Sequence, residues 1–294
     1  MVEMVNVDWT WHWHWGLTAV ILLIGILYWR GWRHGRGLKI KPIQHILFFA
    51  SYILLIVAWI SPLNTLSNQL FSARTVQRIL LIGLIPLLFF LGNAIRVMFA
   101  GLPTKSQQHL INLPQQYPRV YSNLISLTKP SVAWLFFVCC VWLWYDEQLH
   151  HLTLKYQWLH NFEAMLLLTA AMFYWWHILA AAPQLHDPMH PVVRILYALA
   201  GSGPVKIVGL ILLFSTQSIY NYPASIQFQG LTISDQNLGG VLIWTVGGIV
   251  FTWTAVYLTR EWLSLEDEKP YLPHHHWSSN EAMMAPGFGN KKQS

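Results

Sequence analysis

Two residues of types that bind metals, His160 and Glu163, lie three positions apart in the sequence. On a helix, this spacing puts both side chains on one face. An imidazole and a carboxylate on one face can be presented to a single ion such as copper, which imidazole suits well. Two groups do not complete a metal site, however. The pair is therefore a candidate site that needs further ligands from other parts of the chain.

The run Trp11–Trp15 alternates tryptophan with histidine and so holds a second candidate pair, His12 and His14. In an extended segment the two imidazoles share a side, whereas in a helix they point in different directions. A joint metal site therefore requires that the first helix begin after them. The alternative, which we favour, is an aromatic belt at the membrane surface, where tryptophan is enriched.

Two arginines, Arg74 and Arg78, are four residues apart and therefore also share a helix face. Guanidinium groups stay protonated and cannot ligate a metal. They either extend to lipid headgroups or pair with a carboxylate on another helix, for which Glu163 and Asp146 are the candidates. Together with Asp235, these residues predict a polar cluster at one mouth of a helix bundle.

Seven long apolar stretches supply the elements that would position these residues. Of the 294 residues, 54% are hydrophobic and 10% are charged, whereas soluble domains carry about 25% charged residues. Each stretch is about long enough to cross a bilayer, where the backbone must satisfy its own hydrogen bonds. We therefore predict an all-α bundle of seven transmembrane helices, at residues 11–29, 43–61, 78–100, 131–146, 160–182, 192–214 and 238–262.

Basic residues are unevenly distributed among the predicted loops and indicate the orientation. Most of them fall in the first loop, the third loop and the C-terminal tail: Arg30, Arg33, Arg36, Lys39 and Lys41, then Lys105, Arg119 and Lys129, then Arg260, Lys269, Lys291 and Lys292. The positive-inside rule places these segments in the cytoplasm and the N-terminus outside. The polar cluster then lies at the outer mouth of the bundle.

We divide the chain into a seven-span domain, residues 1–264, and a cytoplasmic tail, residues 265–294, which we predict to be disordered. The tail's triplet His274–His276 could catch a metal, but a flexible chain does not preorganise a site. The net charge of +6 arises mainly in loops that face anionic lipid headgroups, so we expect a lipid bilayer and no nucleic acid as partner. Because no phosphate loop or nucleophile motif stands out, we do not expect an enzyme.

Lys206 lies inside the sixth stretch, where an ionisable residue is costly and usually has a reason. Gly201–Pro204 predicts a helix break that would open a wet pocket beside it. One alternative function is a small-solute or ion transporter in which Lys206, Glu163 and Arg96 line a pathway. The two halves of the chain show no inverted repeat of the kind that many transporters have.

A second alternative is a haem-binding membrane protein. His45 and His177 fall at comparable depth near the cytoplasmic ends of two different predicted helices, as two axial ligands would. A histidine near a membrane boundary is more often interfacial. An absorption spectrum would separate the two cases.

Motifs in four of the stretches, spread over about residues 45–262, resemble those of one family. They are Ser61-Pro62-Leu63, Phe71-Ser72-Ala73-Arg74-Thr75-Val76-Gln77-Arg78, Pro86-Leu87-Leu88 with Gly92, His160-Asn161-Phe162-Glu163 with Phe173-Tyr174-Trp175-Trp176, and Asp235-Gln236-Asn237-Leu238-Gly239-Gly240-Val241-Leu242-Ile243-Trp244. In order and position they resemble the caa3-type CtaG family of cytochrome c oxidase assembly factors. The resemblance implies a bacterial plasma membrane protein, or one of another energy-conserving membrane. Such a protein docks on an oxidase subunit and assists maturation of its metal centre, with copper as the suspected cargo.

The chain departs from the family pattern where the family has candidate copper ligands. Histidines common in the family are replaced by Arg74 and Arg78, a His-Leu-Pro run by residues 143–145, and a Glu-His pair by Glu163-Ala164. Of the family's ligands, the resemblance leaves only His160 and Glu163. We therefore expect a diverged member whose outer cluster is held by arginine–carboxylate pairing. His12 and His14 are candidate replacement ligands.

Overall fold

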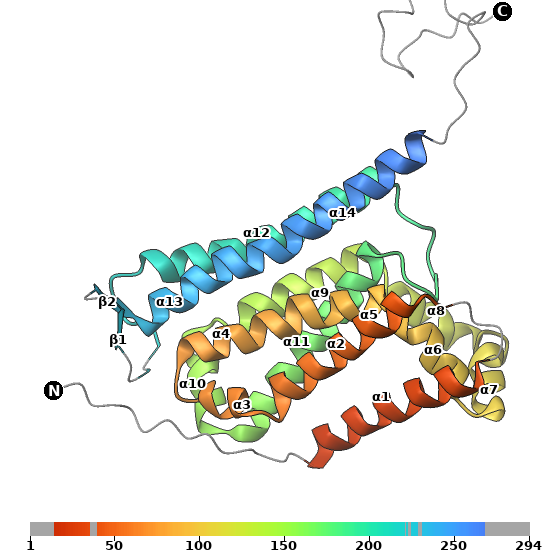
Figure 1. Ribbon diagram of the computed structural model, residues 1–294, viewed down its shortest axis with the longest axis horizontal. Helices are drawn as coiled ribbons and strands as arrows, with labels where there is room; N and C mark the ends of the chain where they lie inside the picture. The colour runs from red at the N-terminus through yellow and green to blue at the C-terminus, as the bar shows by residue number, and fades with distance from the viewer. Residues whose placement is uncertain (1–14, 36–39, 221, 223–224, 229–230, 268–294) are drawn as a thin grey trace, which may run out of the picture.

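The fold is known from a computed structural model, which describes residues 15–35, 40–220, 222, 225–228 and 231–267. These residues form a bundle of long helices with one short hairpin (Figure 1). The long helices are α1 (Trp15–His34), α2 (Pro42–Trp59), α9 (Pro130–Leu143), α11 (Gln157–Ile178), α12 (Pro191–Phe214) and α14 (Gly248–Asp267). Five helices, among them α2, α9 and α12, begin with a proline, whose fixed φ suits the first helical position.

Two long helices, one of which includes α14, are assembled from shorter pieces joined by π-helical turns. In the first, α4 (Phe71–Ile79) continues through a turn at Leu80–Leu84 into α5 (Ile85–Leu91). In the second, α13 (Asp235–Leu242) continues through Ile243–Gly247 into α14. The predicted third stretch, residues 78–100, is thus too late at both ends. It stops at Leu91 because Asn93 adopts a left-handed conformation with φ of 50°, which asparagine tolerates.

Short elements close the two ends of the bundle (Figure 1). At one end lie α3 (Pro62–Leu66), α10 (Glu147–Lys155) and an antiparallel hairpin of β1 (Ser225–Phe228) and β2 (Leu231–Ser234). At the other end lie α6 (Ala94–Gly101), α7 (Thr104–Gln116) and α8 (Pro118–Leu127). We call the first the hairpin end and the second the α7 end.

The core of the bundle is formed where α11 packs between α5, α9 and the first π-helical turn. Trp175 is fully buried there, and its indole N–H donates to the carbonyl of Ile82 at 2.7 Å. That carbonyl has no donor four residues later because Pro86 has no N–H. The indole therefore gives this buried carbonyl a donor in place of the missing proline N–H.

Helix α12 pairs with the α13–α14 helix along one edge of the bundle (Figure 1). A Cβ on Gly240 would come within 2.5 Å of the Leu213 backbone nitrogen, so only glycine permits this approach. Farther along, Arg194 pairs with Glu261 at 3.6 Å. The predicted break at residues 201–204 is wrong, since α12 runs unbroken with Pro204 inside it.

Within the described residues, five helices are long and apolar enough to cross a membrane, or six if the bent pair α8 and α9 is one span. The all-helical, multi-pass architecture is therefore confirmed, but seven spans are not, and the direction of insertion remains a prediction. At 14 residues, α9 alone is shorter than a bilayer-crossing helix of about 20 residues. Helix α11 has 22 residues, and its polar positions lower its mean hydropathy.

The predicted domain boundary at residue 264 falls inside α14, which continues to Asp267. The remaining tail, with the triplet His274–His276, lies outside the described residues. The same holds for His12 and His14, so the structure does not address their roles.

Candidate functional site

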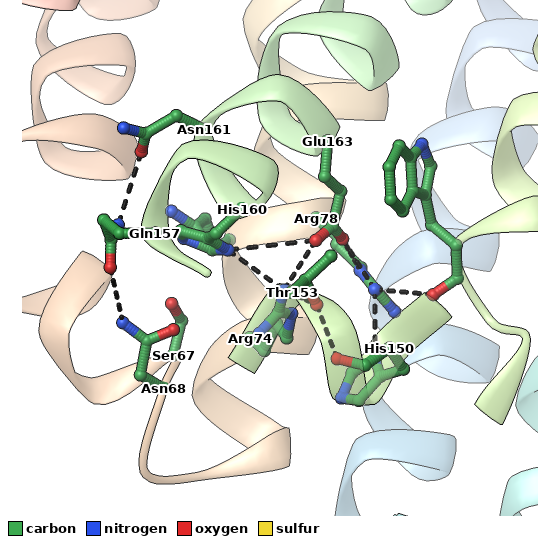
Figure 2. Close-up of polar contacts among 12 residues, drawn as sticks. Ser67, Asn68, Arg74, Arg78, His150, Thr153, Gln157, His160, Asn161 and Glu163 are labelled. Atoms are coloured by element: carbon green, nitrogen blue, oxygen red, sulfur yellow. Dashed lines mark hydrogen bonds and ion pairs between the residues drawn. The ribbon is translucent and has the colours of Figure 1, made fainter. Parts of the chain in front are cut away.

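Helices α4 and α11 bring two arginines and one glutamate together near the hairpin end (Figure 2). Arg74 and Arg78 lie one turn apart on α4 and face Glu163 on α11. The Arg74 Nη2 atom is 2.5 Å from Glu163 Oε2, and the Arg78 Nε and Nη2 atoms are 2.7 and 2.6 Å from Oε1. All three side chains are at most 3% exposed. One carboxylate thus bridges two buried guanidinium groups.

Helix α10 and the segment before it supply further partners for Arg78. Its Nη2 atom donates to the Trp144 carbonyl at 2.7 Å and lies 3.3 Å from His150 Nδ1. Its guanidinium carbon is 4.4 Å from the centre of the Tyr145 ring, within cation–π distance. The carbonyl is free to accept because α9 ends at Leu143, immediately before it.

Arg74 links four segments of the chain. Besides Glu163, its Nη2 atom reaches Thr153 Oγ1 on α10 at 2.6 Å and His160 Nδ1 on α11 at 3.0 Å. Its Nη1 atom lies 3.5 Å from the hydroxyl of Tyr222, in the segment that precedes the hairpin. Arg74 therefore ties α4 to α10, α11 and this connection.

Both ring nitrogens of His160 are engaged, which bears on the candidate copper site. A guanidinium can only donate, so Nδ1 must accept from Arg74 and Nε2 must carry the proton that reaches Asn64 Oδ1 at 2.8 Å. The same amide oxygen accepts from Gln77 Nε2 at 3.0 Å. Both Glu163 oxygens also accept from arginines, and the two guanidinium charges that hold these groups would repel a metal cation. The residues present do not fit a copper site.

His150 is the buried histidine on the other side of the cluster. Its Nε2 atom lies 3.1 Å from the Tyr222 hydroxyl, which in turn donates to the Ser67 carbonyl at 3.3 Å. Burial, and then the guanidinium groups of Arg78 and Arg74, hold the pKa of His150 well below its usual range. The imidazole is therefore neutral and accepts from Arg78 through Nδ1.

The other two predicted members of the cluster, Asp146 and Asp235, lie elsewhere and cap helices. Asp146 is exposed and accepts from the Leu149 backbone N–H at 3.0 Å, as the N-cap of α10. Asp235 is buried and accepts from the Phe71 and Ser72 backbone N–H groups at 2.5 and 3.2 Å. Each carboxylate satisfies orphan donors at a positive helix end. The cluster is therefore smaller than predicted, but both aspartates position helices that carry it.

The charges of the cluster do not cancel. Two guanidinium groups face one carboxylate, and both histidines are neutral by their hydrogen bonds, so one positive charge is left over. Two arginine nitrogens, Arg74 Nε and Arg78 Nη1, have no hydrogen-bond partner among the described residues. Because a buried unpaired charge is costly, the single carboxylate is the dominant stabilising group here.

The remaining candidate residues are dispersed. Lys206 lies in a groove between α12 and α14, apart from this cluster. His45 Nδ1 is 2.8 Å from the Tyr28 hydroxyl, and His177 Nε2 donates to the Thr128 carbonyl at 2.7 Å. No group of three or more histidine, cysteine or acidic residues within the described ranges could hold a metal.

Sequence reasoning missed four residues that complete the cluster: Asn64, His150, Thr153 and Tyr222. A partial signal existed, because His150 and Thr153 are three apart and so share a helix face. Nothing in the sequence, however, shows that α10 folds back against α4. Asn64 lies in α3, a helix of five residues, and Tyr222 lies in a connection; neither element is long enough to show a periodicity.

These observations define the class of protein: a multi-pass α-helical membrane bundle with a buried arginine–glutamate cluster near one end. The sequence matches the cytochrome c oxidase caa3 assembly factor family (Caa3_CtaG) over residues 25–264, and the chain belongs to that family. The resemblance seen in the motifs is thereby confirmed over most of the chain.

Similar curated proteins come from mycobacteria and are described as uncharacterized. Proteins of Mycobacterium bovis and Mycobacterium tuberculosis are each 21% identical over 258 residues, and one of Mycobacterium leprae is 22% identical over 265 residues. These alignments cover 86% of this chain but 39% of each relative, so the chain spans well under half of their length. No solved structure matches the chain.

Proposed function

We propose that this protein is an assembly factor for a haem–copper cytochrome c oxidase and assists maturation of a metal centre from the outer face of the bacterial plasma membrane. The family match over residues 25–264 is the observation that carries the proposal. The positive-inside orientation places the hairpin end outside. An oxidase subunit is the partner and the bilayer is the solvent.

The buried cluster suits a supporting role and not a catalytic one. It joins α4, α10, α11 and the connection at Tyr222 through hydrogen bonds to charged groups, which are stronger than neutral ones. Because the cluster links these segments, it holds the surface of the hairpin end in one conformation. We assign Arg74, Arg78 and Glu163 to that scaffold and no enzymatic activity to the protein.

Docking would use the exposed aromatic residues beside this scaffold. Trp158 and Phe162 are four apart on α11 and are 68% and 50% exposed. Glu163 follows directly on the buried face of the same helix. Aromatic residues are enriched in protein interfaces because they bury large areas with few rotatable bonds.

In this proposal His160 and Glu163 do not bind copper, because both residues are engaged in the hydrogen bonds and ion pairs of the cluster. A metal carried during assembly would be bound by other groups, with His12 and His14 as the candidates on this chain. The oxidase itself would supply the remaining ligands.

Deletion of the gene, with measurement of oxidase activity and oxidase copper content, tests the proposal. Both quantities should fall in the deletion strain and be restored by the intact gene. The docking variant Trp158→Ala should restore them poorly, whereas Trp32→Ala, an exposed tryptophan near the α7 end, should restore them fully. Normal oxidase in the deletion strain would remove this function from consideration.

A further inference from the structure

Lys206 is a charged residue in the membrane-spanning part of α12, on a face that the described residues leave open. Its side chain lies in a groove of about 540 Å³ between α12 and the α13–α14 helix. Its Nζ atom is 5.8 Å from the centre of the Trp244 ring. The nearest end of α12 is Phe214, about 12 Å away along the axis at 1.5 Å per residue.

No carboxylate of the described residues pairs with this ammonium group. The ion pairs they form join Arg74, Arg78 and His160 to Glu163, and Arg194 to Glu261. The α12–α14 pair therefore provides a carboxylate for its other cation, Arg194, but none for Lys206. The Trp244 ring attracts the ammonium group but does not neutralise it, and a lysine in the hydrocarbon region without a counter-charge is unfavourable and normally marks a function.

Lys206 does not reach the lipid headgroups by extending its side chain, so lipid does not neutralise its charge. Helical side chains lean toward the N-terminus of their helix, so Lys206 leans away from the nearer end of α12 at Phe214. The other end of α12, at Pro191, is about 22 Å away along the axis. If the headgroups lie level with the ends of α12, they are out of reach of the ammonium group.

The residues that line the groove around Lys206 suit the packing of a membrane helix. Small residues Thr245, Gly248 and Thr252 line its floor, and such residues let a second helix backbone approach closely. Exposed Ile249 and Trp253, at 65% and 56%, border it. The apolar border accepts a helix from the bilayer, and the lysine selects one with an acidic side chain.

We propose that this groove docks a transmembrane helix of a partner protein that carries an aspartate or glutamate at the depth of Lys206. The partner's carboxylate neutralises the ammonium group, and the helix covers Gly248 and the threonines. This inference stands independently of the proposed assembly function.

Photocrosslinking of the full chain in its native membrane tests this surface. Benzoylphenylalanine at Ile249 or Thr252 is compared with the same group at Ile53, which is 58% exposed on α2. The groove positions should give one protein adduct, and the crosslinked peptide should come from an apolar span with an acidic residue. Position 53 should give only lipid adducts.

Charge variants decide whether Lys206 makes the selection. Lys206→Met, which keeps the length of the side chain, should reduce the adduct at least tenfold, whereas the neighbouring Ile207→Met should not. Lys206→Glu combined with lysine at the partner's acidic position should restore it. Equal melting temperatures of the variants establish that folding is intact.

Three results would overturn the inference. They are an absence of any protein adduct at the groove positions, an adduct made only of this chain's own peptides, and an adduct that persists unchanged in Lys206→Met. The first assigns the groove to lipid, the second to a second copy of the chain, and the third to a partner that ignores the charge.

Discussion

Replacement of Glu163 by glutamine should destabilise the fold more than any other single polar substitution in the cluster. The carboxylate contacts Arg74 and Arg78 at 2.5 to 2.7 Å, and all three side chains are almost completely buried. Glutamine keeps the shape and one acceptor oxygen but removes the negative charge. Two buried guanidinium groups would then face each other without a counter-charge.

The expected loss in the free energy of unfolding is about 3–5 kcal/mol, the range for breaking a buried ion pair by removing one partner. For a chain of this length that corresponds to a fall of roughly 6–20 °C in the melting temperature. The control Glu147→Gln removes an exposed carboxylate from the first turn of α10. It should cost less than about 1 kcal/mol, the value of a charge at a helix end.

Thermal unfolding of the purified protein in lipid nanodiscs, followed by tryptophan fluorescence, measures these shifts. A second comparison isolates the charge from the packing. Arg78→Met with Glu163→Gln leaves one buried guanidinium uncompensated, as in the intact protein. The double variant should therefore be more stable than the sum of the single effects by about 1–3 kcal/mol. Additive effects, or a Glu163→Gln protein as stable as Glu147→Gln, would refute the reasoning.

Three further outcomes are expected. The free energy of unfolding should fall as the pH drops below about 6.5, by up to about 1.4 kcal/mol per pH unit, because the unfolded chain binds a proton at His150 that the fold excludes by lowering the pKa of that residue. His150→Gln should flatten this slope, whereas His151→Gln should not. An unchanged slope in His150→Gln would contradict the neutral state assigned to His150. Asp235→Ala should lower the free energy of unfolding, measured by thermal unfolding, by about 1–3 kcal/mol, since the two backbone N–H groups at the start of α4 lose their acceptor. An unchanged stability would mean that water replaces the cap. Trp175→Phe should cost a similar amount, because the Ile82 carbonyl loses its donor, and hydrogen exchange around the first π-helical turn should rise with it; unaltered exchange would argue against this role.

The sequence was sufficient for the all-helical class because long apolar stretches have few alternatives in a bilayer. Exact bounds were not accessible, since a left-handed Asn93 ends one helix inside an apolar run and α14 continues past an apolar run into a charged one. The family resemblance rested on motifs that run in chain order, and these do not depend on the helix bounds.

For the cluster, a spacing of four was enough to place Arg74 and Arg78 on one face. It could not choose between Glu163 and Asp146 as the partner, because hydropathy does not resolve depth to one helical turn. In the structure, Asp146 is the N-cap residue of α10, and Glu163 faces the arginines. The partners on α10 could not be predicted, because a chain reversal that no local sequence pattern indicates brings them against α4.

Copper quantification on the purified protein tests the central claim, that Arg74, Arg78, His160 and Glu163 form an ion-pair scaffold with no free metal ligand. The protein is loaded with Cu(I), dialysed and compared with the His160→Ala and Glu163→Gln variants by elemental analysis. The scaffold account predicts that neither substitution changes the copper content per chain. Stoichiometric copper that is lost with His160 would contradict it.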